Sequence, residues 1–213
     1  MRFGILGTGM VGKSIATKLI GLEHEVMMGS RSYDNKEAID WTAKNCKRAL
    51  HGTFKDAAEF GEIVFNCTLG SASLNALRIA GNEALANKII VDVSNPLDFS
   101  NVPPSLIVCN TDSLGEQIQR MLPNSRVIKA LNTVNCDVMV NPSILGGHSD
   151  LFICGNDTEA KRIVSEILRS FGWNCIIDLG DISGARAMEM LMPLWLRLFV
   201  NYKHPHFNYK IVQ

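Results

Sequence analysis

The sequence lacks an excess of charge of either sign. Its 213 residues hold 21 lysines and arginines against 21 aspartates and glutamates. Proteins that bind nucleic acid or an anionic membrane surface usually carry a basic excess, because that excess attracts the phosphates. The balance gives no reason to expect a nucleic-acid or membrane partner, and any site for an anion must be local.

The sequence also lacks paired cysteines and long apolar runs. None of its 6 cysteines has the Cys-x-x-Cys spacing of a zinc site or a redox dithiol, so we predict no metal. The longest apolar run, residues 187–200, contains Glu189, Pro193 and Arg197 and is shorter than the roughly 20 residues of a membrane span. No signal peptide precedes the glycine loop that begins at Gly7. We therefore expect a cytoplasmic protein with reduced thiols.

Short apolar strands alternate with helices along the chain. We predict strands over residues 3–6, 24–28, 63–68, 89–93, 106–109, 127–131, 151–154 and 175–178. We predict helices over residues 10–20, 34–46, 74–85, 114–121, 157–170 and 182–200. This alternation is typical of an α/β fold, a Rossmann-type doubly wound parallel sheet. We place a dinucleotide-binding domain at residues 1–145 and a small C-terminal α/β lobe at residues 146–213.

A glycine-rich loop joins the first predicted strand to the first predicted helix. It reads Gly7-Thr8-Gly9-Met10-Val11-Gly12, the Gly-x-Gly-x-x-Gly pattern of dinucleotide-binding sheets. Gly7 permits the tight turn, Gly9 lets the pyrophosphate approach the backbone, and Gly12 lets the helix pack on the strand. The free N–H groups and the positive dipole end of the helix favour the phosphates. We therefore predict that these six residues bind a dinucleotide.

The end of the second predicted strand lacks the acidic residue that accepts a hydrogen bond from the ribose hydroxyl in NAD-binding proteins. Ser30 and Arg31 stand there instead. A hydroxyl and a guanidinium suit a 2′-phosphate, since one donates a hydrogen bond and the other adds charge in a planar fork. We therefore predict NADP(H) as the nucleotide, with Lys36 as a further source of positive charge.

Three other predicted strands end in small polar clusters, within residues 66–71, 92–96 and 129–135. Ligands of open parallel sheets bind at the carboxyl ends of strands. We expect these clusters to hold the ribose and carboxamide of the nicotinamide. The predicted cofactor residues of this group are Thr68, Leu69, Ser94, Asn95, Pro96, Ala130, Asn132 and Thr133. We place Asn132 and Thr133 nearest the nicotinamide and predict no catalytic acid or base.

Taken together, the motifs resemble those of the deazaflavin-coenzyme-dependent NADP reductase family. The resemblance covers almost the whole chain and rests on the glycine loop and on residues 29–31, 91–96, 129–134 and 184–189. The same features are similar to the cytosolic domain of the six-transmembrane metalloreductases. The resemblance implies a Rossmann sheet, a C-terminal lobe that helps to form a homodimer, and hydride transfer between the nicotinamide and a small-molecule acceptor, a deazaflavin or a flavin such as FMN or FAD.

The acceptor side departs from deazaflavin-reducing members, which often have hydroxyl residues after their Arg-x-x-Glu motif. This chain has methionines at positions 188, 190 and 192. We expect a less polar acceptor pocket with broader choice, and we expect Arg186 and Glu189 to hold the C-terminal lobe against the first domain. The apolar helix at residues 182–200 is predicted to lie at the interface of the homodimer.

Two other functions remain open from the sequence. One is an NADP-dependent dehydrogenase of a small carbonyl or imine, which needs a proton donor in the cleft. Lys129 is the one nearby candidate for that role. The other is a module that binds NADP(H) without turnover.

Overall fold

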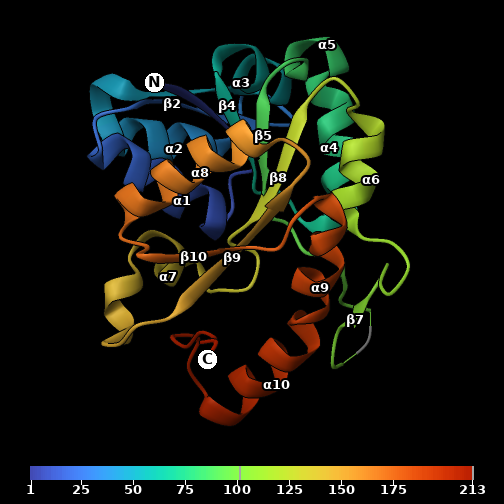
Figure 1. Ribbon diagram of the computed structural model, residues 1–213. Helices are drawn as coiled ribbons and strands as arrows, with labels where there is room; N and C mark the ends of the chain where they lie inside the picture. The colour runs from blue at the N-terminus through green and yellow to red at the C-terminus, as the bar shows by residue number, and fades with distance from the viewer. Residues whose placement is uncertain (101, 213) are drawn as a thin grey trace.

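A computed structural model describes residues 1–100 and 102–212. Helices cover both faces of one eight-stranded sheet, as Figure 1 shows. The strands of this sheet are β1 (Arg2–Leu6), β2 (Glu25–Ser30), β3 (Ala49–Thr53), β4 (Ile63–Asn66), β5 (Ile89–Asp92), β8 (Arg126–Ala130), β9 (Asp150–Gly155) and β10 (Cys175–Asp178). Two short strands, β6 (Leu97–Asp98) and β7 (Ser105–Leu106), form a separate antiparallel pair.

The strand order confirms the predicted Rossmann-type sheet. It runs β10-β9-β8-β5-β4-β1-β2-β3. The six strands that come first in the sequence, β1 to β5 and β8, therefore have the doubly wound order. Their pairs are parallel, whereas β9 is antiparallel to β8. A parallel connection usually needs a crossover helix. Only the short helices α7 (Cys136–Val140) and η2 (Pro142–Leu145) lie between β8 and β9, so the chain turns back at the same edge.

The helices divide into two layers and one projecting helix. One face of the sheet carries α1 (Met10–Gly21), α2 (Lys36–Asn45), α7 and α8 (Thr158–Phe171). The other face carries α3 (Phe54–Phe60), α4 (Gly70–Ala80), α5 (Asn82–Leu85), α6 (Leu114–Met121) and α9 (Ala185–Met190). The short 3-10 helices η1 (Cys46–Arg48) and η3 (Ile182–Gly184) precede β3 and α9. The last helix, α10 (Met192–Tyr202), projects beyond the sheet (Figure 1).

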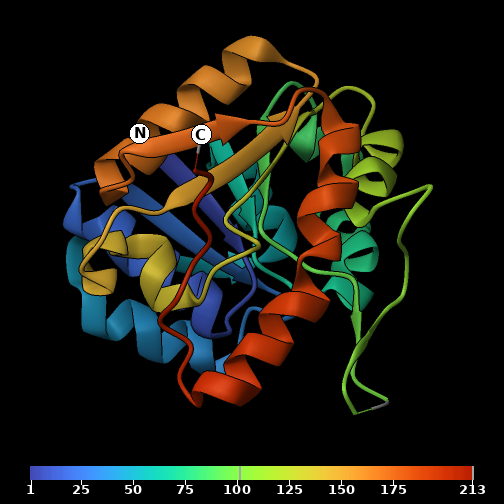
Figure 2. The ribbon, with the colours of Figure 1, turned by 60° about the horizontal axis from the view of Figure 1, so that its bottom comes forward.

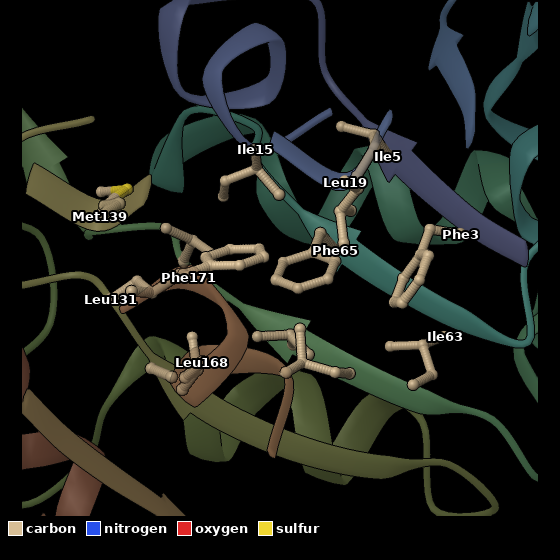
Figure 3. Packing of buried hydrophobic residues seen from close by; sticks show 14 of the residues in the cluster. Phe3, Ile5, Ile15, Leu19, Ile63, Phe65, Leu131, Met139, Leu168 and Phe171 are labelled. Carbon is tan, nitrogen blue, oxygen red and sulfur yellow. The ribbon is translucent and has the colours of Figure 1, made fainter. Parts of the chain in front are cut away.

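Large apolar side chains fill the space between β1, β4 and the first helical layer. Figure 3 shows Phe3 and Phe65 on neighbouring strands, with Ile15 and Leu19 of α1 above them and Phe171 of α8 beside them. The first four are fully buried and Phe171 nearly so. Burying a side chain of this size stabilises the fold by about 1.5–3 kcal/mol. This packing fixes the sheet edge from which the glycine loop starts.

Several segments differ from the sequence prediction. The predicted helix at residues 74–85 is divided at Gly81 into α4 and α5. Residues 49–60, for which the sequence predicts no element, form β3 and α3, joined by a capping box in which Thr53 and Asp56 bond each other's backbone N–H. The predicted strand at residues 106–109 is wrong, since only Ser105–Leu106 pairs, with β6. The predicted helix at residues 182–200 is divided into η3, α9 and α10. Pro193 lacks the N–H that would continue the helix, which explains the break at Leu191.

The C-terminal strands extend the first sheet rather than forming one of their own. β9 pairs with β8 and β10 pairs with β9. The division into domains at residue 145 therefore stays a prediction. Figure 2 shows the last segment of the chain running from α10 back toward β9. The backbone N–H of Asp150 donates to the carbonyl of Tyr209 there (3.0 Å). Within the described ranges, no helix has both the length and the apolar character that crossing a membrane requires.

Candidate functional site

A pocket of about 630 Å³ lies at the carboxyl ends of β1, β4, β5 and β8. The sheet reverses its winding between β1 and β4, which is where ligands bind in open α/β sheets. Ten of the predicted cofactor residues line the pocket: Gly7, Thr8, Gly9, Met10, Val11, Thr68, Leu69, Ser94, Asn95 and Asn132. Gly12, Ser30, Arg31, Lys36, Pro96, Ala130 and Thr133 do not line it. We term the part of the pocket formed by the glycine loop and the ends of β4, β5 and β8 the nucleotide half. We term the part formed by Leu97, Phe99, Met192 and Trp195 the apolar half.

The glycine loop has the geometry that each glycine predicts. Gly7 has a φ of +117°, and a Cβ there would come within 2.8 Å of the carbonyl oxygen of Cys67. A Cβ at Gly12 would overlap the carbonyl oxygen of Gly7 beneath the loop. A Cβ at Gly9, in contrast, meets nothing within 4 Å. Gly9 begins α1 without a side-chain cap. The open space and the free N–H groups of α1 suit a pyrophosphate.

The end of β2 lies beyond this pocket along the sheet. Ser30 is buried, and its hydroxyl accepts a hydrogen bond from the backbone N–H of Ser32 (3.1 Å). Arg31 is exposed, so its guanidinium is available to a ligand. The ammonium of Lys36 pairs with Asp40 at 2.7 Å, which turns it along α2. Of the two cations that the sequence predicted, Lys36 is thus engaged in an ion pair, whereas Arg31 has no ion pair among the described residues.

Two asparagines join the polar clusters at the ends of β5 and β8. Asn95 Nδ2 donates to the carbonyl oxygen of Asn132 at 2.8 Å, and Asn132 Nδ2 donates to Asn95 Oδ1 at 2.9 Å. Asn66, at the end of β4, joins the remaining cluster to the end of β5, because its Nδ2 donates to Asp92 Oδ1 at 2.8 Å. These contacts bring the three clusters together at one edge of the sheet.

Two buried oxygen atoms in this region have no hydrogen-bond partner among the described residues. They are Asn132 Oδ1 and Thr133 Oγ1, on side chains that are 2% and 1% exposed. Buried polar atoms are nearly always paired, and an exception is often explained by a ligand. The Asn132 amide oxygen is the kind of acceptor that a carboxamide N–H requires. The nucleotide half therefore fits a nicotinamide.

A buried ionic cluster, which we term the buried triad, consists of Asp92, Lys129 and Glu189. Lys129 Nζ contacts Asp92 Oδ2 at 2.7 Å and Glu189 Oε1 at 2.8 Å, and all three residues are at most 1% exposed. Burial alone would lower the pKa of Lys129, but the two carboxylates together raise it above its ordinary value. Lys129 therefore carries a charge and lies outside the pocket, where it cannot supply a proton to a carbonyl or imine substrate.

Glu189 and Arg186 join α9 to α6. The Glu189 carboxylate accepts from the backbone N–H groups of Leu114 (2.8 Å) and Gly115 (3.0 Å) at the start of α6. Arg186 forms a bidentate ion pair with Glu116, in which Nε donates to Oε2 at 2.8 Å and Nη2 donates to Oε1 at 2.5 Å. These contacts fasten α9 to α6 and to the sheet.

The other half of the pocket is apolar, and sequence reasoning missed most of it. Leu97 and Phe99 approach from the β6 side, and Met192 and Trp195 approach from α10. Of the three methionines expected at the acceptor, Met192 alone lines the pocket. Trp195 stacks on Phe199 and Phe207 at centroid distances of 5.5 and 5.2 Å. No short motif marks these residues, because they meet only in the folded chain. The remaining lining residues are Cys67, Gly70, Val93, Val134, Asn135, Cys136 and Met139.

The described residues that line the pocket include no lysine, arginine, histidine, aspartate or glutamate. The two thiols that line it are Cys67 and Cys136, and burial raises the pKa of each. Both therefore remain protonated and are poor nucleophiles. No group of three or more metal-ligating side chains occurs in residues 1–100 and 102–212. The arrangement can position flat groups against one another, but it offers no side chain for acid–base or covalent catalysis.

Comparison with known proteins identifies the family. The model of the family "NADP oxidoreductase coenzyme F420-dependent" matches residues 2–96. A crystal structure from Arthrobacter sp. FB24, which carries the provisional name F420-dependent NADP reductase, is 44% identical with a TM-score of 0.95, and the match covers all of both chains. The F420-dependent NADP reductase of Methanocaldococcus jannaschii is 28% identical, covering 95% of this chain and 94% of that protein.

A longer relative matches over almost the same residues. The metalloreductase STEAP3 of Rattus norvegicus is 30% identical across 96% of this chain, which spans only 38% of the length of STEAP3. The Arthrobacter protein, in contrast, matches from end to end at well above 30% identity. The chain therefore belongs to the coenzyme F420-dependent NADP reductase family and is an NADP-dependent oxidoreductase.

Proposed function

We propose that the pocket holds NADP(H) and a flavin-like or deazaflavin-like ring face to face, so that a hydride passes between them. The observation that carries this proposal is the division of one pocket into a polar nucleotide half and an apolar, aromatic half. Asn95 and Asn132 belong to the first half, and Met192 and Trp195 to the second. When bound, NADPH supplies a hydride to the oxidised ring, solvent supplies one proton, and NADP⁺ and the reduced ring result.

The side chains of the nucleotide half have separate tasks in this proposal. The glycine loop binds the pyrophosphate, and Arg31 with Ser30 binds the 2′-phosphate. Asn132 accepts a hydrogen bond from the carboxamide through its unpartnered Oδ1. Anchoring both ends of the nucleotide in this way fixes which face of the nicotinamide is open to the acceptor. Orientation is the main contribution of a protein to hydride transfer between two rings.

The apolar half excludes water and accepts a flat ring. Trp195 offers an indole that is already ordered by stacking on both of its neighbours. The absence of charged side chains among the described lining residues suits an uncharged ring better than a small polar carbonyl. We therefore propose a deazaflavin such as coenzyme F420, which the names of the relatives mention, or a flavin such as FMN or FAD, as the acceptor.

The test is stopped-flow oxidation of NADPH against a panel of acceptors. The panel contains a deazaflavin, FMN, FAD, a quinone and a small cyclic imine. We expect rapid oxidation with at least one ring acceptor, faster with NADPH than with NADH. Rapid turnover of the imine with no ring acceptor active would overturn the proposal in favour of a dehydrogenase.

We also propose a homodimer that uses α10. Leu194, Phe199 and Val200 leave 49%, 40% and 65% of their surfaces exposed on this helix. Exposed apolar surface of this extent on one helix marks an interaction site. Sedimentation at micromolar concentration should give the dimer mass, and Val200→Asp should shift the protein toward the monomer. A wild-type protein that sediments as a monomer at this concentration contradicts the proposal.

A further inference from the structure

The buried triad is an ionic cluster that the proposed hydride transfer does not use. Two carboxylates, Asp92 and Glu189, face one ammonium, Lys129, so two negative charges against one positive charge leave a net charge of −1. All three side chains are shielded from solvent. A neutral cluster of the same shape would fill the space equally well, since buried ion pairs can often be replaced without loss of stability. The uncompensated charge therefore needs its own explanation.

The triad lies directly behind the wall of the nucleotide half. Lys129 Nζ donates to the carbonyl oxygen of Ser94 at 2.5 Å. Asp92 Oδ1 accepts from the Ser94 hydroxyl at 2.6 Å and from Asn66 Nδ2 at 2.8 Å. Ser94 and Asn95 line the pocket. One residue thus separates the charges from a bound nucleotide, and the intervening space is filled by protein, where charges interact more strongly than in water.

The start of α6 only partly offsets the negative charge. Glu189 accepts from two backbone N–H groups there, at Leu114 and Gly115. A helix N-terminus carries roughly half an elementary positive charge. Some net negative potential therefore remains at the pocket wall.

A nicotinamide ring is positively charged when oxidised and uncharged when reduced. We propose that the buried triad strengthens binding of NADP⁺ relative to NADPH and so lowers the reduction potential of the bound nucleotide. This inference rests on the proposed function, because it places the nicotinamide against Ser94, Asn95 and Asn132. Its consequence is that bound NADPH becomes a stronger hydride donor. The triad acts by its field alone and exchanges no proton or electron.

The test compares the dissociation constants of NADP⁺ and NADPH, each measured by equilibrium titration. Glu189→Gln and Asp92→Asn each change the net charge of the triad from −1 to 0. We expect the ratio Kd(NADP⁺)/Kd(NADPH) to rise roughly tenfold in each variant, which corresponds to about 1.4 kcal/mol. A purely structural defect would weaken both nucleotides together and leave the ratio unchanged.

Two controls separate charge from structure. The double variant Asp92→Asn/Lys129→Met removes one charge of each sign and keeps the net charge at −1, so the ratio should stay at the wild-type value. Glu116→Gln makes the same substitution elsewhere in the contact between α6 and α9. Its partner Arg186 is 37% exposed, so solvent screens that pair and the ratio should not move.

If the single variants do not fold, the triple variant Asp92→Asn/Lys129→Met/Glu189→Gln replaces them. It contains no buried charge in the triad and should show the tenfold rise relative to the double variant. A ratio within twofold of wild type in the folded charge-changing variants overturns the inference. No ring acceptor takes part in these titrations. Failure of acceptor turnover therefore overturns the proposed function alone, whereas an unchanged ratio overturns the role of the triad alone.

Discussion

The nucleotide half and the apolar half of the pocket are built in different ways. The nucleotide half is built on the glycine loop and the strand ends. There the Asn95 and Asn132 side chains bond each other, and Lys129 of the buried triad donates to the Ser94 carbonyl oxygen. The apolar half consists of side chains from α10 and the β6 region, which contact one another by stacking. Backbone geometry leaves little room for substitution, whereas stacked side chains can be exchanged. Substitutions in the first half should therefore impair nucleotide binding, in some cases together with stability, and substitutions in the second half should impair use of the acceptor.

The largest effect is expected at Gly12. A Cβ there would overlap the carbonyl oxygen of Gly7, which is backbone and cannot move aside cheaply. Gly12→Ala should reduce the free energy of unfolding by roughly 3 kcal/mol, as measured by chemical denaturation, and should abolish NADPH binding. The decrease in the free energy of unfolding should be found in the absence of nucleotide.

Gly9→Ala is the matched control within the same loop. Nothing lies within 4 Å of a Cβ at Gly9, so the free energy of unfolding should remain at the wild-type value. NADPH binding should still weaken, because the methyl group would occupy the approach of the pyrophosphate. If Gly9→Ala binds NADPH as the wild type does, the loop does not hold the phosphates.

The next effect is expected at the 2′-phosphate. Arg31→Ala should weaken NADPH binding by about 1.5–3 kcal/mol, the range for hydrogen bonds to charged groups, and should leave NADH binding unchanged. Lys36→Ala should have a smaller effect, because the Lys36 ammonium pairs with Asp40. Titrations of both nucleotides against the three proteins check this. Equal affinity of the wild-type protein for NADPH and NADH would remove the basis of the NADP assignment.

The smallest effect is expected in the apolar half. Trp195→Ala should lower kcat/KM for a ring acceptor about tenfold, since an aromatic stacking pair contributes about 0.5–1.5 kcal/mol. The dissociation constant of NADPH should not change, because Trp195 lies on α10 and belongs neither to the glycine loop nor to the strand ends proposed to bind NADPH. Trp195→Phe should restore most of the activity. An equal loss of NADPH affinity in Trp195→Ala would show that the two halves are not separable.

The same difference explains what the sequence could predict. The glycine loop, Ser30 and Arg31 are local motifs, so a strand, a turn and a helix in order are enough to predict a nucleotide site there. The partners of Lys129 lie 37 residues before it and 60 residues after it, at Asp92 and Glu189. No local pattern joins them, and Lys129 was therefore considered a proton donor in the cleft. Trp195 was missed for the same reason, because only the folded chain brings α10 to the glycine loop.

Two errors in the fold also have local physical causes. The strand β3 reads Ala-Leu-His-Gly-Thr, with a glycine inside and few β-branched residues, so its pattern is weak. Its position is fixed by pairing with β2 at the edge of the sheet. The long apolar run at residues 182–200 predicts one continuous helix, but Pro193 lacks the backbone N–H that a helix interior needs, so a new helix begins there.

The break at Leu191 separates a fixed part of the chain from a replaceable part. Before it, α9 is fastened through Arg186 and Glu189. After it, α10 carries Met192 and Trp195 on a helix of 11 residues. Each residue advances a helix by about 1.5 Å and turns it by about 100°. Inserting or deleting one residue at the break would change the direction of α10 while leaving the contacts of α9 in place. A scaffold of this kind can evolve toward a new electron acceptor by exchanging one short helix while its nucleotide chemistry is inherited unchanged.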